Sequence, residues 1–140
     1  MTDEIPPPPE GFVQSTNRGA FSTLNGPYFH RAATLELTEQ AFFALPRHAN
    51  GIGLVHGGML SAFMDGLLAG AVGRASGLLA VTIHLSIDFL HMARVGDWVV
   101  GEARMTRATK DVAFAEGRAQ ARGVDVVRAS GVFKLMSRRG

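Results

Sequence analysis

Cysteine is absent from the sequence. This absence excludes disulfide bonds, thiolate catalysis and zinc sites built on cysteine, and it suits a cytoplasmic protein. No apolar run approaches the roughly 20 residues that a membrane-spanning helix needs. The start of the chain is acidic and proline-rich and lacks the apolar region of a signal peptide. We therefore expect a cytoplasmic location and no membrane partner.

Charge is also sparse, and neither sign dominates. The chain carries 14 Lys and Arg against 12 Asp and Glu, for a net charge of +2, and the basic residues are scattered. This pattern argues against nucleic-acid binding. The composition is 46 % hydrophobic and only 19 % charged, which is more apolar than a typical free-standing domain. We expect another subunit to cover part of the surface.

The length of 140 residues suits one domain. Residues 1–10 include four consecutive prolines, which favour polyproline II, so we expect a disordered tail there and a single domain over 11–140. After a turn at Asn25-Gly26-Pro27, strands are expected at Tyr28–Arg31 and Thr34–Leu37. Two segments stay open at this point: 11–24, as a short helix or packed coil, and 39–45, as a helical turn or irregular strand end.

One long helix is predicted from Gly57 to about Ala75, with Gly77 as its C-cap. Its apolar residues recur at helical spacing and form one wide stripe: Leu60, Phe63, Met64, Leu67, Leu68, Ala71 and Val72. Three glycines lie together on another side: Gly66, Gly70 and Gly73. Each costs about 1 kcal/mol relative to alanine inside a helix, so their repetition predicts that another element packs closely there.

Alternating segments follow the helix. From Ala80 to Phe89, apolar residues alternate with a polar row of Thr82, His84, Ser86 and Asp88, which predicts a strand with one face over the helix. Three further strands with short turns are expected, at Trp98–Arg107, Val112–Arg122 and Val126–Met136, as an antiparallel meander. The fold class is therefore α+β, one long helix lying on an antiparallel sheet.

The start of the predicted helix carries the chemistry. His56-Gly57-Gly58 leaves the first helical N–H groups uncrowded, so a carbonyl or anion can approach them. Asp65 is the only acid in the helix and has apolar neighbours, a costly arrangement unless the carboxylate has a function or a partner. Together these features suggest a site for an ester-like carbonyl and a water.

The pattern N-x5-H-G-G-x6-D, formed by Asn50, His56-Gly57-Gly58 and Asp65, resembles that of PaaI-type acyl-CoA thioesterases. The resemblance extends to Asn25-Gly26-Pro27-Tyr28 upstream and to Ser86-Ile87-Asp88-Phe89-Leu90 downstream. It implies the hotdog fold, a curled antiparallel sheet around a central helix. It also implies hydrolysis of an acyl-CoA thioester to a free acid and CoA, without a cofactor.

By the same resemblance, the Gly57 N–H polarises the thioester carbonyl, and Asn50 lies near that carbonyl or the attacking water. Asp65 acts as general base or as nucleophile, two roles that the sequence does not separate. Thr82 helps to hold the water or the carboxylate. Each of these residues also has a plain structural interpretation. Gly57 would simply permit the tight entry into the helix, and Asn50 would form a turn. Asp65 would be a capping or surface carboxylate, and Thr82 an ordinary strand residue.

The substrate surroundings are predicted more loosely. His56, chiefly structural, and Gly58 flank the site, and an aryl or medium-chain pocket is expected from Phe63, Met64, Leu68 and Phe89. Candidates for the CoA phosphates are Arg74, Arg94, Arg107 and Lys110. The resemblance further implies a homodimer or a dimer of dimers (a homotetramer), with the glycine of one subunit facing the aspartate of the other.

Other readings remain at this stage. A non-catalytic acyl-CoA sensor would use the same pocket, and a hotdog hydratase or dehydratase would pair a histidine such as His84 with an acid. His84 and His91 show no metal-ligand spacing, so no metal is expected. Ser61 lacks the G-x-S-x-G context of a serine hydrolase nucleophile.

Overall fold

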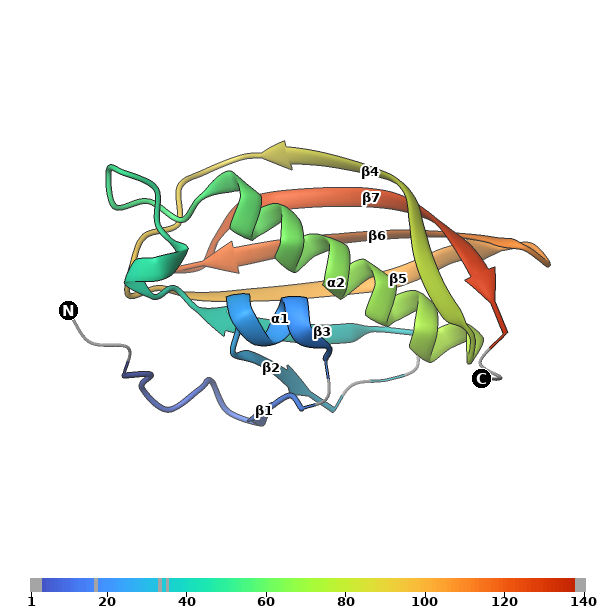
Figure 1. Cartoon of the computed structure of the whole chain (residues 1–140), viewed down its shortest axis with the longest axis horizontal. Helices are drawn as coiled ribbons and strands as arrows, with labels where there is room; N and C mark the ends of the chain where they lie inside the picture. Colours follow the sequence, from blue (N-terminus) through green and yellow to red (C-terminus); the bar gives the residue numbers. More distant parts are fainter. Residues whose placement is uncertain (1–3, 17, 33, 35, 138–140) are drawn as a thin grey trace.

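A seven-stranded antiparallel sheet curls around one long helix in the computed structural model, which describes residues 4–16, 18–32, 34 and 36–137 (Figure 1). The strand order is β1-β2-β3-β5-β6-β7-β4. The strands are β1 (Phe12–Gln14), β2 (Tyr28–Arg31), β3 (Thr38–Phe43), β4 (Leu79–Phe89), β5 (Trp98–Ala108), β6 (Val112–Ala121) and β7 (Val124–Met136). The helices are α1 (Ala20–Asn25), the short 3-10 helix η1 (Pro46–His48) and α2 (Gly57–Ser76).

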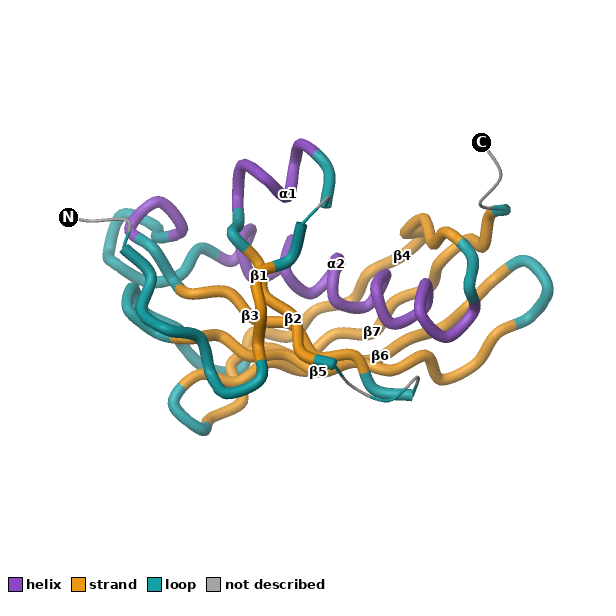
Figure 2. The backbone as a smooth tube through the Cα atoms, turned by 90° about the horizontal axis from the view of Figure 1, so that it is seen from below, coloured by secondary structure: helices purple, strands orange, loops and turns teal. Residues whose placement is uncertain are grey.

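Helix α2 lies across one face of the sheet, as Figure 2 shows from below. Its N-cap is His56, whose ring Nδ1 accepts the N–H of Gly58 at 2.7 Å. Its C-cap is Gly77, in the left-handed conformation (φ 73°), whose N–H donates to the carbonyl of Gly73. The predicted helix, its C-cap and the hotdog arrangement are thus confirmed. None of the helices in the described ranges is long and apolar enough to cross a bilayer.

Small residues line the sheet where α2 crosses it. The inner-face positions of β5, β6 and β7 include Gly101, Ala103, Ala113, Ala115, Gly117, Ala119 and Ala129. A Cβ atom on Gly101 would lie 2.7 Å from Cδ2 of Leu67, and one on Gly117 would lie 2.7 Å from the carbonyl oxygen of Glu102 and 3.0 Å from Cδ1 of Leu68. The small residues at these positions therefore let Leu67 and Leu68 of the helix pack directly against the backbone of β5 and β6.

The glycine side of α2 meets a different neighbour. A Cβ atom on Gly70 would lie 2.8 Å from Nε2 of Gln40 in β3, and one on Gly66 would lie 3.0 Å from Nη2 of Arg18. The Arg18 guanidinium stacks over the Tyr28 ring, 4.5 Å from its centroid. The predicted close packing against these glycines is confirmed, with β3 and the segment before α1 as the elements involved.

The N-terminal third departs from the sequence prediction. Thr34, Glu36 and Leu37 do not form a strand, because the N–H of Leu37 turns back to the carbonyl and hydroxyl of Thr34; Leu35 lies outside the described residues. The strand begins at Thr38 instead, in the stretch left open by the sequence. Residues 4–10 carry no helix or strand, yet Ile5 packs beside Phe12 in a small second cluster.

Strand β4 contains a bulge that changes which side chains face the helix. Thr82 pairs with Phe133 and His84 with Val132, so Ile83 is an extra residue in the ladder. Thr82 consequently points toward α2, whereas Ser86 and Asp88 line the outer face of the sheet. The prediction of one continuous polar row from Thr82 to Asp88 is therefore wrong. β4 also pairs with β7, so only β5, β6 and β7 form the meander.

Replacing Gly117 by valine tests the close contact between helix and sheet. Its Cβ would meet a backbone carbonyl, which cannot rotate away, so we expect a loss of about 1–3 kcal/mol in the free energy of unfolding. Urea denaturation measures it. Glu116→Val is the matched control, on the same strand but facing outward with an exposed ion pair worth little. Equal stability of the two variants would contradict the packing argument.

Candidate functional site

The start of α2 offers one free backbone donor. His56 Nδ1 accepts a hydrogen bond from the N–H of Gly58, so the ring caps the helix and carries its proton on Nε2. This geometry matches the structural role expected for His56. The N–H of Gly57 makes no hydrogen bond within the described part of the chain. The Phe89 ring, 56 % exposed as a residue, lies beside this position, 3.5 Å from where a Cβ on Gly57 would be.

Asn50 shapes the loop that leads into the helix. Its Oδ1 accepts the N–H groups of Ile52 at 3.0 Å and Leu54 at 3.1 Å, and its own N–H donates to the carbonyl of Leu54. Two backbone donors on one atom fix the orientation of the amide. The side-chain NH2 group is consequently the part of Asn50 left to donate outside the loop.

Asp65 lies two turns further along α2 and faces the edge strand. The hydroxyl of Thr82 donates to its Oδ1 at 2.5 Å, a contact that exists because the bulge at Ile83 turns Thr82 inward. Among the described residues, Oδ2 has no hydrogen-bond partner. The nearby hydroxyl of Ser61 is used by the helix, since it donates to the carbonyl of Gly57 at 2.7 Å. Asp65 is therefore positioned but still able to accept a proton.

The two groups singled out on α2 lie at different points along the helix. Gly57 and Asp65 are eight residues apart on the same helix, which places them about 12 Å apart along its axis. A thioester carbonyl and its attacking atom are within about 3.5 Å of each other. The Gly57 N–H and the Asp65 carboxylate are thus well separated along the helix of one chain.

Three of the predicted pocket residues lie in the core. Phe63, Met64 and Leu68 are 1 %, 0 % and 0 % exposed and pack between α2 and the sheet. Core packing accounts for them without a ligand, and they do not enter the site built here. The sequence reasoning missed Phe21 and Leu24 of α1, which are 71 % and 79 % exposed and flank the start of α2. Their i, i+3 spacing before the Asn25 turn was the available signal.

The four candidate phosphate-binding cations lie in different places. Arg74 donates to the carbonyl of Leu37 and to the Thr38 hydroxyl. Arg107 and Lys110 lie at the hairpin between β5 and β6. Only Arg94 is next to the helix-entry loop, where it forms a β-bridge with Leu54. Within the described ranges, no group of three His, Asp or Glu residues could hold a metal, and His84 has no bond to an acid.

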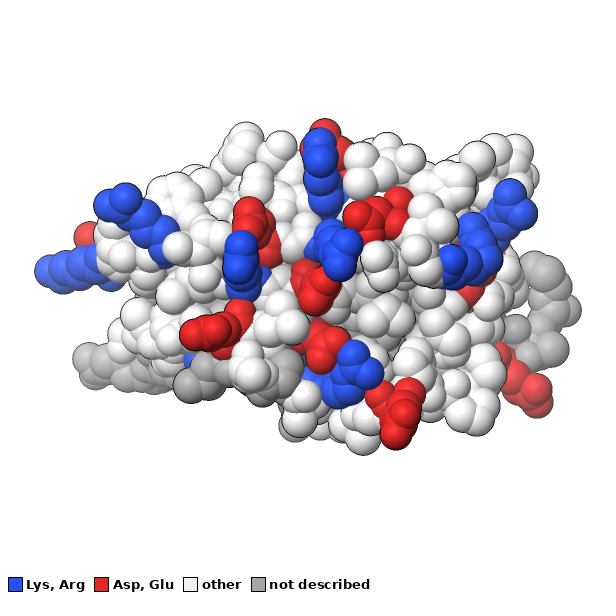
Figure 3. Space-filling view, turned by 180° about the vertical axis from the view of Figure 1, so that it is seen from behind, with Lys and Arg blue, Asp and Glu red and all other residues white. Residues whose placement is uncertain are grey.

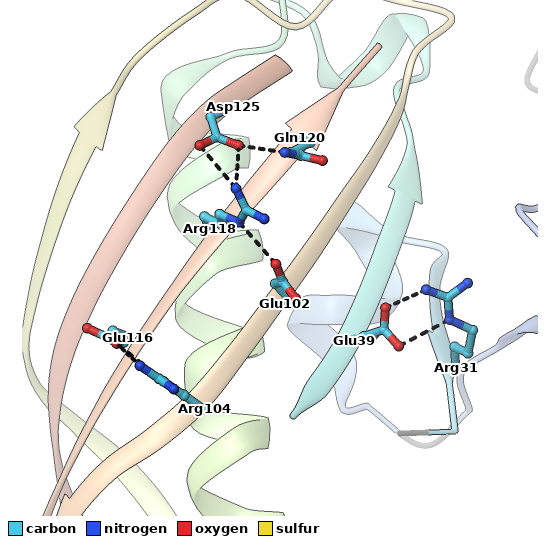
Figure 4. A network of polar contacts seen from close by, with 8 residues as sticks. All are labelled: Arg31, Glu39, Glu102, Arg104, Glu116, Arg118, Gln120 and Asp125. Carbon is cyan, nitrogen blue, oxygen red and sulfur yellow. Dashed lines mark hydrogen bonds and ion pairs between the residues drawn. The ribbon is translucent and has the colours of Figure 1, made fainter. Parts of the chain in front are cut away.

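The densest charges lie on the outer face of the sheet, away from α2 (Figure 3). Figure 4 shows how they pair: Arg118 lies between Glu102 at 3.0 Å and Asp125 at 3.2 Å, and Arg104 contacts Glu116 at 3.0 Å. The hydrogen bond from Gln120, helped by Arg118, lowers the pKa of Asp125. A hollow lies among these pairs, but neither Gly57 nor Asp65 borders it. The candidate site is therefore on the helix side.

Comparison with known proteins identifies the family. A family model described as the thioesterase superfamily matches residues 52–127, a span that contains Gly57, Asp65 and Thr82. A Pseudomonas aeruginosa protein provisionally named an esterase is 36 % identical over 129 residues, which cover 91 % of this chain and 96 % of that protein.

Solved structures share the fold. A Ralstonia eutropha protein, described provisionally as a thioesterase related to phenylacetic acid degradation, aligns with a TM-score of 0.77 and 27 % identity, covering 85 % of this chain and 92 % of its own. A hypothetical thioesterase of Streptococcus pneumoniae, solved with coenzyme A, aligns with a TM-score of 0.74 and 19 % identity over 81 % and 88 % of the chains. With its free N–H at the helix start and its carboxylate held by Thr82, this chain belongs to the thioesterase superfamily.

Proposed function

We propose that the protein hydrolyses an acyl-CoA thioester to a carboxylic acid and CoA. The observation that carries this proposal is the pair of complementary groups on α2: an unpartnered N–H at Gly57 and a carboxylate at Asp65 held by Thr82. The N–H can donate a hydrogen bond to a carbonyl oxygen, and the carboxylate can accept one from a water. The coenzyme A bound by the pneumococcal structure supports the choice of thioester.

In the proposed reaction, the Gly57 N–H and the positive end of the α2 dipole stabilise the charge that develops on the carbonyl oxygen. The NH2 group of Asn50 orients the carbonyl or the water. Asp65 takes a proton from the water as it adds to the carbonyl carbon, and collapse of the tetrahedral intermediate expels the CoA thiolate. Direct attack by Asp65 would instead expel the CoA thiolate and form a mixed anhydride, which water then opens. A single turnover in ¹⁸O-labelled water distinguishes the two routes: the general-base route labels only the product acid, whereas water addition to the Asp65 carbonyl of the anhydride labels Asp65.

We further propose that two copies complete each site. β4 is an open edge of the sheet, and its outward apolar residues are 43–58 % exposed: Leu79, Val81 and Ile83. A long apolar edge strand is a template for pairing with another strand. Pairing of β4 with its own copy would continue the sheet and bring Gly57 of one subunit toward Asp65 of the other. The two groups of one site would then come from different chains, and their spacing of about 12 Å along one helix would no longer matter.

Asp65→Asn tests the carboxylate. Asparagine keeps the size of the side chain and an oxygen for Thr82, so folding should be preserved, while proton transfer is lost. We expect kcat to fall about 10²–10⁴-fold, measured as thiol release from a panel of acyl-CoAs. Asp111→Asn, the same change in an exposed hairpin, should keep wild-type turnover. Near wild-type activity in a folded Asp65→Asn protein would reject the assignment.

Gly57→Pro tests the backbone donor. Gly57 is the first residue of α2 and follows an extended His56 (φ −62°, ψ 138°), so proline fits the backbone and removes only the N–H. We expect a loss of about 10²–10³-fold in kcat. Gly57→Ala retains the N–H and is the control. Equal activity of the proline and alanine variants would exclude this N–H from the site.

Mixing the two inactive variants tests the shared site. A dimer of one Gly57→Pro chain and one Asp65→Asn chain has one site with both defects and one with neither. After subunits exchange, we expect about a quarter of wild-type activity, since half of the dimers are mixed and half of their sites are intact. Exchange is verified with differently tagged chains. No recovery despite exchange would mean that each site belongs to one chain.

A further inference from the structure

A groove runs between α1 and the first turns of α2. It has a volume of about 390 Å³, and it starts at His56 and Gly58, the two neighbours of Gly57. Its apolar surface comes from Phe21 and Leu24 of α1 and from Met59 and Ala62 of α2. The groove is therefore continuous with the point where the carbonyl is proposed to bind.

Helix α1 is held firmly at its C-terminal end. The Tyr28 hydroxyl donates to Oδ1 of Asn25 at 2.5 Å, and Nε2 of His48 donates to the carbonyl of Asn25 at 2.7 Å. Arg47 donates to the carbonyls of Leu24, at 2.8 Å, and Gly26. Three side chains from β2 and η1 thus fix a helix of only six residues in place.

This anchoring occupies the two polar side chains that η1 contributes to the groove, Arg47 and His48. Arg47 is the one cation among the described lining residues, and its donors point to backbone carbonyls. His48 accepts the N–H of Leu45 through Nδ1 while Nε2 binds Asn25, and burial lowers the pKa of His48, which favours the neutral ring. What the groove offers a ligand is apolar surface, without a free charge to meet an anionic group.

Phe21 and Leu24 remain largely uncovered, although α1 is anchored so that they flank the groove. Large apolar side chains held on a fixed rim next to a reactive centre suit a ligand better than they suit solvent. An engineered cavity of about 150 Å³ holds a benzene molecule, so this groove has room for an aryl group with its linker or for a medium-length chain.

We infer that an uncharged, apolar acyl group of the thioester lies in this groove, and that Phe21 and Leu24 determine acyl specificity. The inference rests on the proposed thioester hydrolysis and adds the substrate class. The carbonyl sits at Gly57, the acyl group extends past His56 and Gly58, and α1 closes over it. Acyl groups that end in a carboxylate are disfavoured because the described lining of the groove has no free cation to pair with the carboxylate.

The test is the double variant Phe21→Ala, Leu24→Ala, assayed with acetyl-, octanoyl- and phenylacetyl-CoA. Alanine favours the helix, so α1 keeps its conformation. We expect kcat/KM for the octanoyl and phenylacetyl substrates to fall about tenfold, chiefly through KM, and acetyl-CoA to be unaffected because its acyl group is too short to reach α1. Val13→Ala, at another exposed apolar residue on β1, is the control and should change nothing.

A second variant, Ala62→Leu, narrows the floor of the groove. It should reduce turnover of the two bulky substrates and spare acetyl-CoA. An unchanged substrate profile in both variants would overturn the inference while leaving thioester hydrolysis in place. So would a concentration-dependent loss of the oligomer in the double variant, measured by light scattering, since this would make the rim a subunit contact.

Failure of the proposed function is distinguished by a binding measurement. If the wild-type protein releases no thiol from any acyl-CoA, the hydrolysis proposal fails. Calorimetry with a non-hydrolysable thioether analogue of phenylacetyl-CoA then still tests the groove. Weaker binding by the double variant than by Val13→Ala supports the groove, and equal binding by both rejects it.

Discussion

The structure depends on one packing constraint, large helix residues against small sheet residues. Leu67 and Leu68 project from α2 onto Gly101 of β5 and Gly117 of β6, on the concave side of the sheet. The contact at Gly117 leaves no space for even one more carbon. This contact fixes how deep the helix lies and therefore where Gly57 and Asp65 lie relative to the strands. The geometry of the proposed site is thus tied to core packing.

The bulge at Ile83 links the sheet to the site. Without the extra residue, Thr82 would share a face with Ser86 and Asp88 and would point away from the helix. With it, the hydroxyl reaches Asp65, and the strand beyond keeps its alternation. The bulged strand is also the free edge of the sheet. One local irregularity thus positions the carboxylate on the strand along which we propose that two chains meet.

The geometry of the helix is the reason for proposing a site shared by two chains. A helix start is the natural place for an oxyanion donor, and the middle of a helix can hold a carboxylate against an edge strand. The rise of the helix keeps the two apart, and the proposed dimer would bring each group next to its counterpart on the other chain. In this proposal the thioester group of the substrate binds at the contact between subunits, and its acyl group binds in the groove under α1.

The sequence by itself determined the features that are local or periodic. Helical spacing gave α2 within one residue at its end, alternation gave β4, β5, β6 and β7, and N-x5-H-G-G-x6-D located Gly57 and Asp65. These patterns depend on neighbours along the chain, which a sequence displays directly. It misjudged Thr34–Leu37, where a threonine side chain turns the backbone.

Only the tertiary structure decided the rest. The pairing of β4 with β7, the inward Thr82, the buried Phe63 and the groove under α1 all depend on residues distant in sequence. The alternation around Thr82 looks regular in the sequence, because a bulge is defined by the partner strand and not by the strand that carries it. Contacts between segments far apart in the chain leave no periodic trace in either segment, and the site is built from such contacts.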